Sequence, residues 1–442
     1  MTARAIFFSR LRGACPGLSA PLPTGDGLLV RMLPIGTIPL EDFGTLCGAA
    51  REHGNGVVEI TTRGSVQIRG LSAESAPRFA DAIAALNIAA ADGIRVLSNV
   101  LAGLDPEEVF DAGALAADLR RALAQASLAA RLAPKVSVVV DSGGALALDK
   151  LAADVRLRAE QINGRIALLA SVGGDGTNSA QLGAIAPADG AEAAMRMLGV
   201  IAQYGRDARA RDILAVNGAD VFLAALADLV PTPAHPRTSA DPEMHSRLSG
   251  NERTVEAIGT HRLRDGSLAC GVGLAFGHAD ASALEHLADA AETAGAKGMR
   301  AAPDRTLMII GVPQEVAPSL ATAAERLGFI VGADDARRRV IACAGAPVCA
   351  SAHIATRTIA PGIAATAAPF PDGAFTIHLS GCAKGCAHAG TAALTVVGSP
   401  DGCELIASGS TRDTPFATVA ADALPPAIRQ YARERRREDG HV

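Results

Sequence analysis

The chain has 442 residues, of which 20% are charged and 49% hydrophobic, with no Trp and a formal net charge of −5. This length suits about three domain-sized units. The slightly acidic balance argues against a nucleic-acid-binding protein, which usually presents a basic face. Arginine outnumbers lysine 37 to 4, so the position of each lysine is informative.

No segment has the properties of a secretion signal or a membrane span. The first 13 residues carry Arg4, Arg10 and Arg12 among their apolar side chains and contain no long apolar core, unlike a signal peptide. No window has the roughly 18 consecutive apolar residues that a transmembrane helix needs. The sequence therefore predicts a soluble cytoplasmic protein.

An internal repeat is the clearest structural signal. Residues 28–71 show the pattern of a strand, a helix and two short strands joined by a turn, and residues 270–312 show the same order. A further helix is expected after each copy, near 74–86 and 314–327. Two pairs of glycines keep one spacing of 241 residues: Gly36 with Gly277, and Gly70 with Gly311.

A longer α/β segment follows each repeat. Matching strand-like runs lie at 135–141 and 165–172 in the first segment and at 375–380 and 403–407 in the second. The chain is therefore predicted to consist of two similar halves, roughly 20–230 and 265–430. A Pro-rich stretch at 231–242 is expected to join them.

The eight cysteines are unevenly placed, and five lie in the last quarter of the chain. Cys343 and Cys349 have five residues between them, whereas Cys382 and Cys386 have three. Four thiolates from two loops can each bind one iron of a [4Fe–4S] cubane. The Ala, Gly and Pro residues between them allow the backbone to approach a cluster closely. Lys384 lies inside the second loop, beside the expected negative charge.

A buried core role and a structural zinc site are the alternatives to a cluster for these cysteines. Cysteine is often a small apolar core residue, but two closely spaced pairs are unusual for that role. A structural zinc site usually separates its thiols by two to four residues, and the gap of five exceeds this range. The spacing favours the cluster over both.

This cysteine pattern on a duplicated α/β chain resembles the sulfite and nitrite reductase family, in which a [4Fe–4S] cluster shares its last cysteine with the iron of sirohaem. The resemblance covers residues 13–408. In finer detail, the chain resembles the branch that makes precorrin-3B in the aerobic route to cobalamin. The closer match lies in CPGLSAP at 15–21, TGDGLLVR at 24–31, SGCAKGCAH at 380–388 and ALTVVG at 393–398.

The resemblance implies an internally duplicated α/β (α+β) fold of the nitrite/sulfite reductase type. Ferredoxin-like half-domain repeats are expected at 20–90 and 265–330. A larger α/β domain without cluster ligands is expected at 91–230, and a second one, carrying the [4Fe–4S] cluster, at 335–430.

Reductases of this family hold their anion with two arginines and two lysines, so the resemblance can be checked position by position. Arg63 ends a matching Thr-Thr-Arg run, and Lys135 matches the first lysine. Ser98, before Asn-Val, stands where the second arginine is expected, and Ser137 stands at the second lysine. A small oxyanion needs dense positive charge, so the missing charges predict a different substrate.

The closer resemblance implies O2-dependent hydroxylation of precorrin-3A at C20, with formation of a γ-lactone. Precorrin-3A is a metal-free relative of sirohaem and would occupy its place. NADH or a reductase is the expected electron donor, although no G-x-G-x-x-G fingerprint is present. A substrate rich in carboxylates calls for arginine. The expected substrate-binding residues are Arg63, Arg69, Lys135 and Lys384, with Arg63 and Lys135 also catalytic; Arg12 and Arg31 lie near the matching motifs.

The branch is also associated with a mononuclear non-haem iron, and its ligands are not evident from spacing. His353 and His388 are the imidazoles nearest the cysteine loops, and a 2-His-1-carboxylate set is one arrangement. The turn at 173–176 offers backbone N–H groups to propionates or is a plain loop. The tail at 431–442 is expected to be a solvated end.

Two alternative functions stand beside this one. The first is a sirohaem-dependent sulfite or nitrite reductase, against which Ser98 and Ser137 argue. The second is a non-catalytic Fe–S electron carrier, which would not need a duplicated chain of this length.

Overall fold

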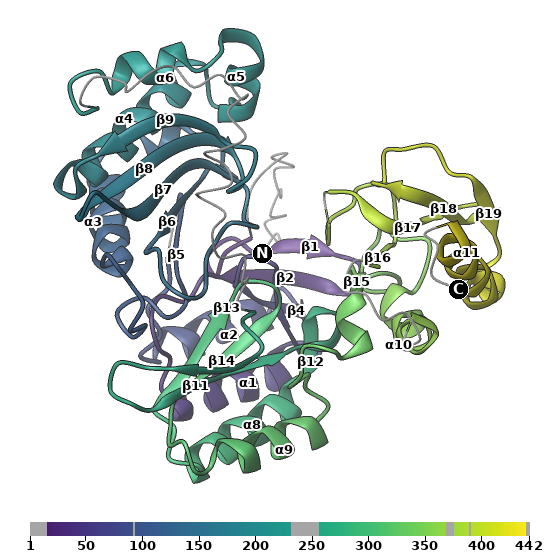
Figure 1. The fold of residues 1–442 in the computed structure, drawn as a ribbon. Helices are drawn as coiled ribbons and strands as arrows, with labels where there is room; N and C mark the ends of the chain where they lie inside the picture. Colours follow the sequence, from purple (N-terminus) through teal and green to yellow (C-terminus); the bar gives the residue numbers. More distant parts are fainter. Residues whose placement is uncertain (1–15, 92, 231–255, 368–374, 389, 439–442) are drawn as a thin grey trace, which may run out of the picture. The chain divides into compact units, whose positions relative to one another are not determined.

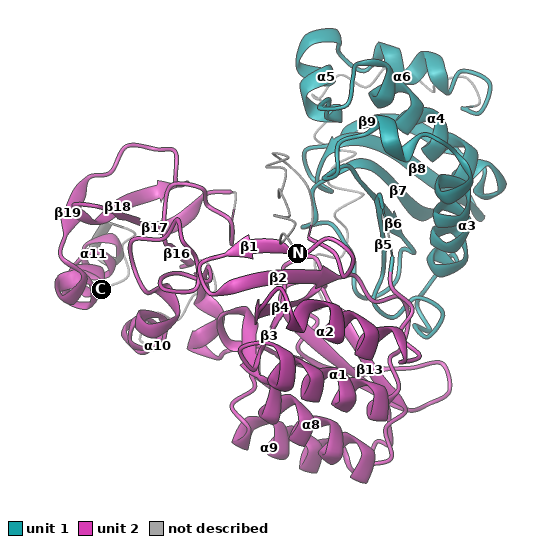
Figure 2. Ribbon diagram, turned by 180° about the vertical axis from the view of Figure 1, so that it is seen from behind, with its two compact units in different colours: residues 1–15, 91–255 teal, residues 16–90, 256–442 magenta. Residues whose placement is uncertain are grey.

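A computed structural model describes residues 16–91, 93–230, 256–367, 375–388 and 390–438 (Figure 1). Arg12, Cys15 and the Pro-rich stretch at 231–242 lie outside the described residues. Residues 91–230 form one compact unit, and the other described residues form a second (Figure 2). Among the described residues, no helix is long and apolar enough to cross a membrane.

The second unit contains both copies of the repeat, as the sequence predicts. Each copy forms an antiparallel sheet, in the orders β1-β2-β4-β3 and β10-β11-β14-β13. The first copy consists of β1 (Leu22–Thr24), β2 (Gly27–Met32), α1 (Leu40–His53), β3 (Val57–Ile60), β4 (Val66–Leu71) and α2 (Ser75–Ala84). The second consists of β10 (Gly259–Arg262), β11 (Leu268–Gly273), α8 (Ala281–Thr293), β13 (Gly298–Ala302), β14 (Thr306–Val312) and α9 (Ala317–Arg326).

Both copies bury their apolar side chains in one shared core. In β3 and β4, alternate residues such as Val58 and Ile68 point into this core, as expected for strands with one covered face. On α8, Leu284 and Leu287 lie three positions apart on the buried face. Helices α1 and α8 begin 241 residues apart, as do β3 and β13, so the repeat spacing holds for whole elements.

The two copies exchange backbone hydrogen bonds through an equivalent contact made twice. Strand β12 (His278–Asp280) joins the sheet of the first copy, where Ala279 pairs with Val58 of β3. In the other direction, Ile38 pairs with Met299 of β13, with N···O distances of 2.8 Å both ways. The second pair is the first pair moved by 241 positions, so the copies are related by an approximate two-fold axis.

The two longer α/β segments share a second topology. Each has a five-stranded sheet. Its first three strands are parallel to one another, and each of its last two strands is antiparallel to the strand before it. Unit 1 contains β5 (Arg95–Ser98), α3 (Ala112–Gln125), β6 (Ser137–Asp141), β7 (Ala153–Ile162), β8 (Arg165–Gly174), β9 (Ala180–Ile185), α4 (Gly190–Gln203), α5 (Ala210–Asn217) and α6 (Asp220–Ala225). Unit 2 contains β15 (Val340–Ala342), α10 (Thr356–Ala367), β16 (Ile377–Ser380), β17 (Ala392–Ser399), β18 (Gly402–Gly409), β19 (Ala417–Val419) and α11 (Leu424–Glu438).

The C-terminal segment differs from the predicted solvated tail. Helix α11 places Ile428 and Ala432 in the core beside the sheet of β15 to β19. The ring of Tyr431 stacks on Phe416 with centroids 5.4 Å apart, and its hydroxyl donates to the carbonyl of Ala393 at 3.0 Å. The prediction is therefore wrong for the first residues of the tail, because an apolar stripe lies among its charges.

Candidate functional site

The predicted cluster ligands follow two neighbouring parallel strands. Cys343 comes directly after β15, and Cys382 and Cys386 come after β16. The carboxyl ends of parallel strands meet at one edge of a sheet, which is where ligands of open α/β sheets usually bind. The structure therefore brings the two cysteine loops to one edge.

Backbone contacts fix the two cysteine loops against each other. The Gly381 N–H donates to Cys343 Sγ at 3.1 Å, and the Gly381 carbonyl accepts from the His353 N–H at 2.7 Å. Gly345 has a φ of +68°, and a Cβ there would lie 2.3 Å from Thr356 Oγ1. Only glycine meets both conditions.

The four thiols are close enough to affect one another. Burial and the nearby Cys382, Cys343 and Cys349 raise the pKa of the Cys386 thiol, while Lys384 acts to lower it. Cys386 is exposed and the other three are half-buried. Among the described residues, no three His, Cys, Asp or Glu side chains are grouped so that they could hold a single metal ion. A cubane, unlike a single ion, spreads its ligands over four irons.

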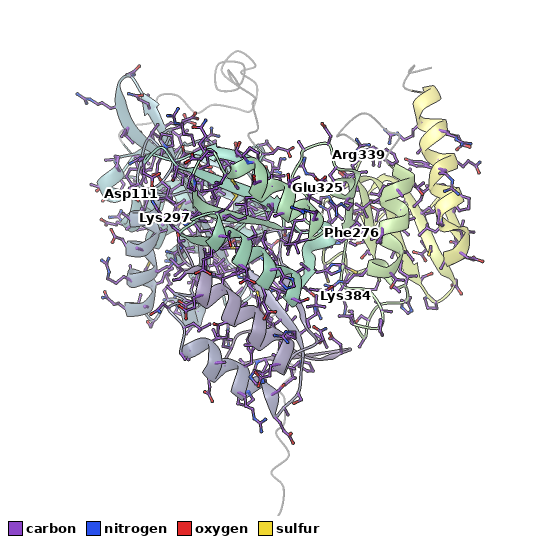
Figure 3. All side chains as sticks on the ribbon, turned by 90° about the horizontal axis from the view of Figure 1, so that it is seen from below. Asp111, Phe276, Lys297, Glu325, Arg339 and Lys384 are labelled. Carbon is purple, nitrogen blue, oxygen red and sulfur yellow. The ribbon has the colours of Figure 1, made fainter. Side chains whose placement is uncertain are left out.

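Lys384 connects the two loops at the surface. Its ammonium group donates to Ser351 Oγ at 2.7 Å, and its exposed position is labelled in Figure 3. Cys403 is fully buried in β18 and packs in the core of the sheet. It is a core thiol, whereas Cys15 lies outside the described residues.

The two histidines near the loops belong to no metal-binding group of three His, Cys, Asp or Glu side chains in the described part of the chain. His353 is exposed, and His388 Nε2 lies 3.0 Å from the carbonyl of Thr391. The ring of His388 meets the buried His378 edge-on, with centroids 5.6 Å apart. Burial, helped by the nearby His388 and Arg305, lowers the pKa of His378 to about 4, so His378 is neutral near pH 7.

The first repeat contacts the cysteine loop through the turn between β1 and β2. The Gly25 N–H donates to the Val348 carbonyl at 3.1 Å. A Cβ on Gly25 would lie 2.6 Å from the Pro347 oxygen and 2.7 Å from the Ala350 nitrogen. Any side chain would therefore push the turn and the loop apart. This contact explains why the second residue of the TGDG motif is a glycine.

The sheet of the first repeat carries a polar cluster on the face opposite its core. Glu59 is 6% exposed. Its carboxylate accepts from Gln67 Nε2 at 2.5 Å and from Arg69 Nε at 2.6 Å. Gln67 Oε1 in turn accepts from Arg31 Nε at 2.6 Å. Arg357, near the start of α10, also donates to the Glu59 carboxylate. We refer to Glu59, Gln67, Arg31, Arg69 and Arg357 as the arginine cluster.

Glu59 is ionised in spite of its burial. Burial alone would raise the pKa of its carboxyl group, but the charges and hydrogen bonds of Arg357 and Arg69 outweigh it and lower the pKa below 4.5. An anion between two guanidinium groups is a charge-assisted arrangement that fixes the direction of both forks.

Arg63 lies in the turn between β3 and β4 and is half-buried. Its backbone N–H donates to Thr61 Oγ1 at 3.3 Å, and it forms a β-bridge with Pro303 of the second repeat. The next residue, Gly64, has a φ of +72° and packs against the backbone of Ala302. Contact between the repeats thus fixes the backbone of the Thr-Thr-Arg turn.

In unit 1, the structure separates two positions that the family resemblance places in one anion site. Strands β5 and β6 are parallel, with Arg95 opposite Ser137 and Ser98 opposite Val140. The exposed Lys135 precedes β6 and so lies beyond its amino end, whereas Ser98 ends β5 at the opposite edge. Arg95, rather than Ser98, lies on the same edge of the sheet as Lys135.

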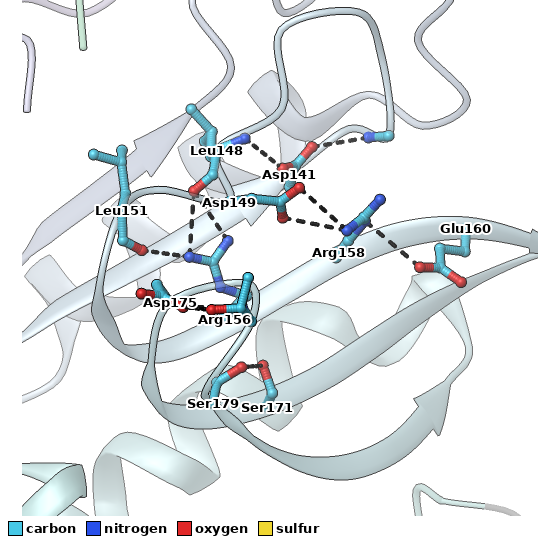
Figure 4. Close-up of polar contacts among 12 residues, drawn as sticks. Asp141, Leu148, Asp149, Leu151, Arg156, Arg158, Glu160, Ser171, Asp175 and Ser179 are labelled. Carbon is cyan, nitrogen blue, oxygen red and sulfur yellow. Dashed lines mark hydrogen bonds and ion pairs between the residues drawn. The ribbon is translucent and has the colours of Figure 1, made fainter. Parts of the chain in front are cut away.

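The carboxyl edge of β5 and β6 is filled by protein groups (Figure 4). Asp141 accepts from Asn99 Nδ2 at 3.1 Å and from the Leu148 N–H at 2.8 Å. The buried Arg156 donates to the Leu148 carbonyl at 3.3 Å and also to the Leu151 carbonyl. These contacts fill the carboxyl edge of β5 and β6. The equivalent edge of the other sheet, after β15 and β16, carries the cysteines.

The glycine-rich turn at 173–176 uses its amides within the protein. The Gly176 N–H donates to the Asp149 carbonyl at 2.8 Å, and the Asp175 N–H donates to Asn178 Oδ1 at 2.9 Å. The structure therefore favours the plain loop over a propionate-binding turn.

Sequence reasoning missed Glu59 and Arg357. Glu59 had a signal, because it is a single carboxylate within the apolar strand sequence Val-Val-Glu-Ile. Arg357 had none, because only the fold brings the start of α10 to β3. Gln67 lies two positions before Arg69 on the same side of β4, but its bonds to Glu59 and Arg31 depend on strand pairing.

Comparisons with known proteins agree with this geometry. Residues 20–86 and 261–327 match the family model of the nitrite/sulfite reductase ferredoxin-like half domain. Over 426 residues, the chain is 36% identical to a precorrin-3B synthase of Sinorhizobium sp, covering 96% of this chain and 89% of that protein. The chain belongs to the precorrin-3B synthase family. This result confirms the branch to which the sequence motifs point.

More distant relatives show how far the fold extends. A ferredoxin–nitrite reductase of Synechococcus elongatus is 23% identical over 459 residues, covering 94% of this chain and 87% of that protein. The solved structure of NirA from Mycobacterium tuberculosis has a TM-score of 0.74 at 20% identity, covering 92% of this chain and 80% of that chain. The duplicated nitrite/sulfite reductase-type fold is thus confirmed.

The first prediction concerns the contact between the β1–β2 turn and the cysteine loop. We expect Gly25→Ala to lower the free energy of unfolding by about 1–3 kcal/mol, because its Cβ would overlap backbone atoms. Gly17→Ala is the matched control, since no atom lies within 4 Å of its added Cβ. Urea denaturation of both variants measures the difference, and equal stability of the two would contradict the contact.

The second prediction follows from the lowered pKa of Glu59. A carboxyl group whose pKa is lower in the folded state stabilises the fold above its unfolded value, here 4.5, and loses that contribution as the pH falls through the folded value. We expect Glu59→Gln to be the less stable protein at pH 7, by about 3–5 kcal/mol. The difference from the wild type should shrink below pH 4.5. Urea denaturation across this range tests it, and a constant difference would contradict it.

Proposed function

We propose that this protein acts as a precorrin-3B synthase. It would hydroxylate precorrin-3A at C20 in an O2-dependent reaction, with formation of a γ-lactone. The observation that carries the proposal is the arginine cluster, which lies on the sheet of the first repeat and reaches the cysteine loop through Arg357. A tetrapyrrole rich in carboxylates suits guanidinium groups, which bind carboxylates with two parallel hydrogen bonds.

We further propose that Cys343, Cys349, Cys382 and Cys386 hold a [4Fe–4S] cluster. The donor set fits, because the four thiols lie on two loops that follow neighbouring strands of one sheet, and a backbone N–H already donates to Cys343 Sγ. When bound, the cluster supplies single electrons from an external donor. NADH or a reductase is the donor we propose. A mononuclear non-haem iron is implied by the family branch alone, and no group of three ligands for it lies among the described residues.

The residues of the chain would bind and orient the substrate. We propose that Arg69 and Lys384 bind its carboxylates, Arg69 from the buried sheet face and Lys384 from the surface of the cysteine loop. Arg63 and Lys135 are proposed to bind substrate and to act in catalysis as positive groups. Glu59 has both of its oxygens occupied, so it serves as an anchor and does not transfer protons.

A sirohaem-dependent sulfite or nitrite reductase is the second candidate, and one observation favours it. Arg95 lies opposite Ser137, on the edge of the sheet near Lys135. That edge therefore carries more positive charge than the motif comparison alone suggests. A dense positive site is what a small oxyanion needs.

One experiment separates the candidates. Protein purified without oxygen is examined by absorption spectroscopy and then given precorrin-3A, a chemical reductant and O2. We expect an iron–sulfur spectrum without sirohaem bands, and O2-dependent conversion of precorrin-3A detected by mass spectrometry. Sirohaem bands with sulfite or nitrite reduction would support the reductase. An intact cluster without conversion of any of these substrates would indicate an electron carrier.

A separate prediction tests whether Cys386 is a ligand of the proposed cluster. Cys386→Ser should abolish or strongly diminish the cluster absorbance and the bound iron and sulfide, because serine is a poor ligand for this cluster. Cys403→Ala is the control, since that thiol lies in the core of the sheet and should leave iron content unchanged. Full cluster content in Cys386→Ser would overturn the assignment.

A further inference from the structure

We propose that Glu59 is a positioning residue, which holds the guanidinium groups of Arg69 and Arg357 for the substrate carboxylates and couples this binding site to the cluster loop. The inference rests on the proposed function, since it takes a tetrapyrrole carboxylate as the ligand. It adds a residue that no motif identifies and a physical link between two parts of the site.

The place of Glu59 in the sheet explains how it can hold Arg69 and Arg357 in fixed directions. It lies within β3, opposite Gln67 of β4 on one side and His278 of β12 on the other. One carboxylate oxygen accepts from both Arg69 and Arg357, and the other accepts from Gln67. Because strands flank it on both sides, the carboxylate has little freedom to turn, and the two arginines are held with it.

The two arginines keep unused donors. Arg69 Nη1 and Arg357 Nε are buried and have no hydrogen-bond partner among the described residues. The other carboxylate near Arg69 is Asp26, whose oxygen is 3.8 Å from Arg69 Nη1. A buried donor without a partner costs about 1–3 kcal/mol, and a substrate carboxylate is an acceptor that would relieve this cost at both arginines.

The second repeat shows that the half-domain fold does not need the contacts of Glu59 with Gln67 and Arg69. The residues 241 positions after Glu59, Gln67 and Arg69 are Arg300, Met308 and Ile310. The same sheet therefore forms with a different and largely apolar set at these positions. A requirement of the fold would be met in both copies, whereas a ligand-binding role is needed in only one.

The link to the cysteine loop passes through neighbouring residues. The Thr356 hydroxyl donates to the Cys343 carbonyl at 2.7 Å and lies 3.8 Å from Cys343 Sγ. Arg357 is the next residue and bonds to Glu59. A displacement of the cysteine loop would thus move the Arg357 side chain, and binding at the arginine cluster would restrain the loop.

The test uses the cluster-loaded protein without oxygen, so that binding is measured apart from turnover. Precorrin-3A is titrated and its binding followed by the change in tetrapyrrole absorbance. We expect Glu59→Gln to weaken binding about tenfold or more, because two charge-assisted contacts lose their fixed direction. Glu285→Gln is the matched control, since Glu285 pairs with Arg51 at the surface at 3.3 Å; its binding should equal that of the wild type.

A second readout reports the link itself. Binding of precorrin-3A should change the electron paramagnetic resonance spectrum of the reduced cluster in the wild type, and this change should be much smaller in Glu59→Gln. If that variant does not fold, Arg357→Gln, which leaves the Glu59–Arg69 pair in place, must show both effects. Wild-type binding, or an unaltered spectral change, in the folded variant would overturn the proposal.

The failure of the proposed function gives a different result. A wild-type protein that binds precorrin-3A, with binding weakened by Glu59→Gln, but never converts it would refute the synthase activity and leave the positioning role intact. A wild-type protein that does not bind precorrin-3A would refute both.

Discussion

The candidate site depends on the strand that the second repeat contributes to the sheet of the first. Strand β12 lies along β3, so β3 is an interior strand and Glu59 is shielded from water. At an open edge, the ion pairs of Glu59 would be exposed, and exposed pairs contribute about 0–1 kcal/mol. Burial raises the cost of breaking them and fixes the directions of Arg69 and Arg357. Pairing between the repeats therefore turns surface charges into an ordered, buried polar cluster.

The two halves of the chain repeat their topology and differ in what occupies equivalent places. After β15 and β16, the edge of the sheet carries cysteines, whereas after β5 and β6 it carries Asn99 and the Asp141 network. The repeats diverge in the same way, because Glu59 has Arg300 as its counterpart. In each pair, one copy keeps groups suited to a ligand and the other satisfies its polar groups within the protein.

Local patterns predicted the fold well, because the repeat spacing and strand alternation are encoded in neighbouring residues. The expected strand-like runs do not include β7 and β17, which lie between the runs that the sequence indicates in each segment. The cysteine motif could be recognised from spacing alone. The arginine cluster could not, because Arg357 and Glu59 are 298 positions apart and meet only through packing. The sequence also does not reveal that Lys135 and Ser98 lie toward opposite ends of the neighbouring parallel strands β6 and β5, because strand register depends on the fold.

The closed edge of β5 and β6 bears on how the protein matures in a cell. Asn99 and Asp141 complete their hydrogen bonds with protein groups, so the 91–230 unit needs no metal to finish that edge. On the proposed function, the equivalent edge of the other sheet would be completed by an iron–sulfur cluster bound to its four thiols. Under that proposal, a shortage of iron would affect only one of the two sheets, because the sheet of the 91–230 unit completes its edge with protein groups alone.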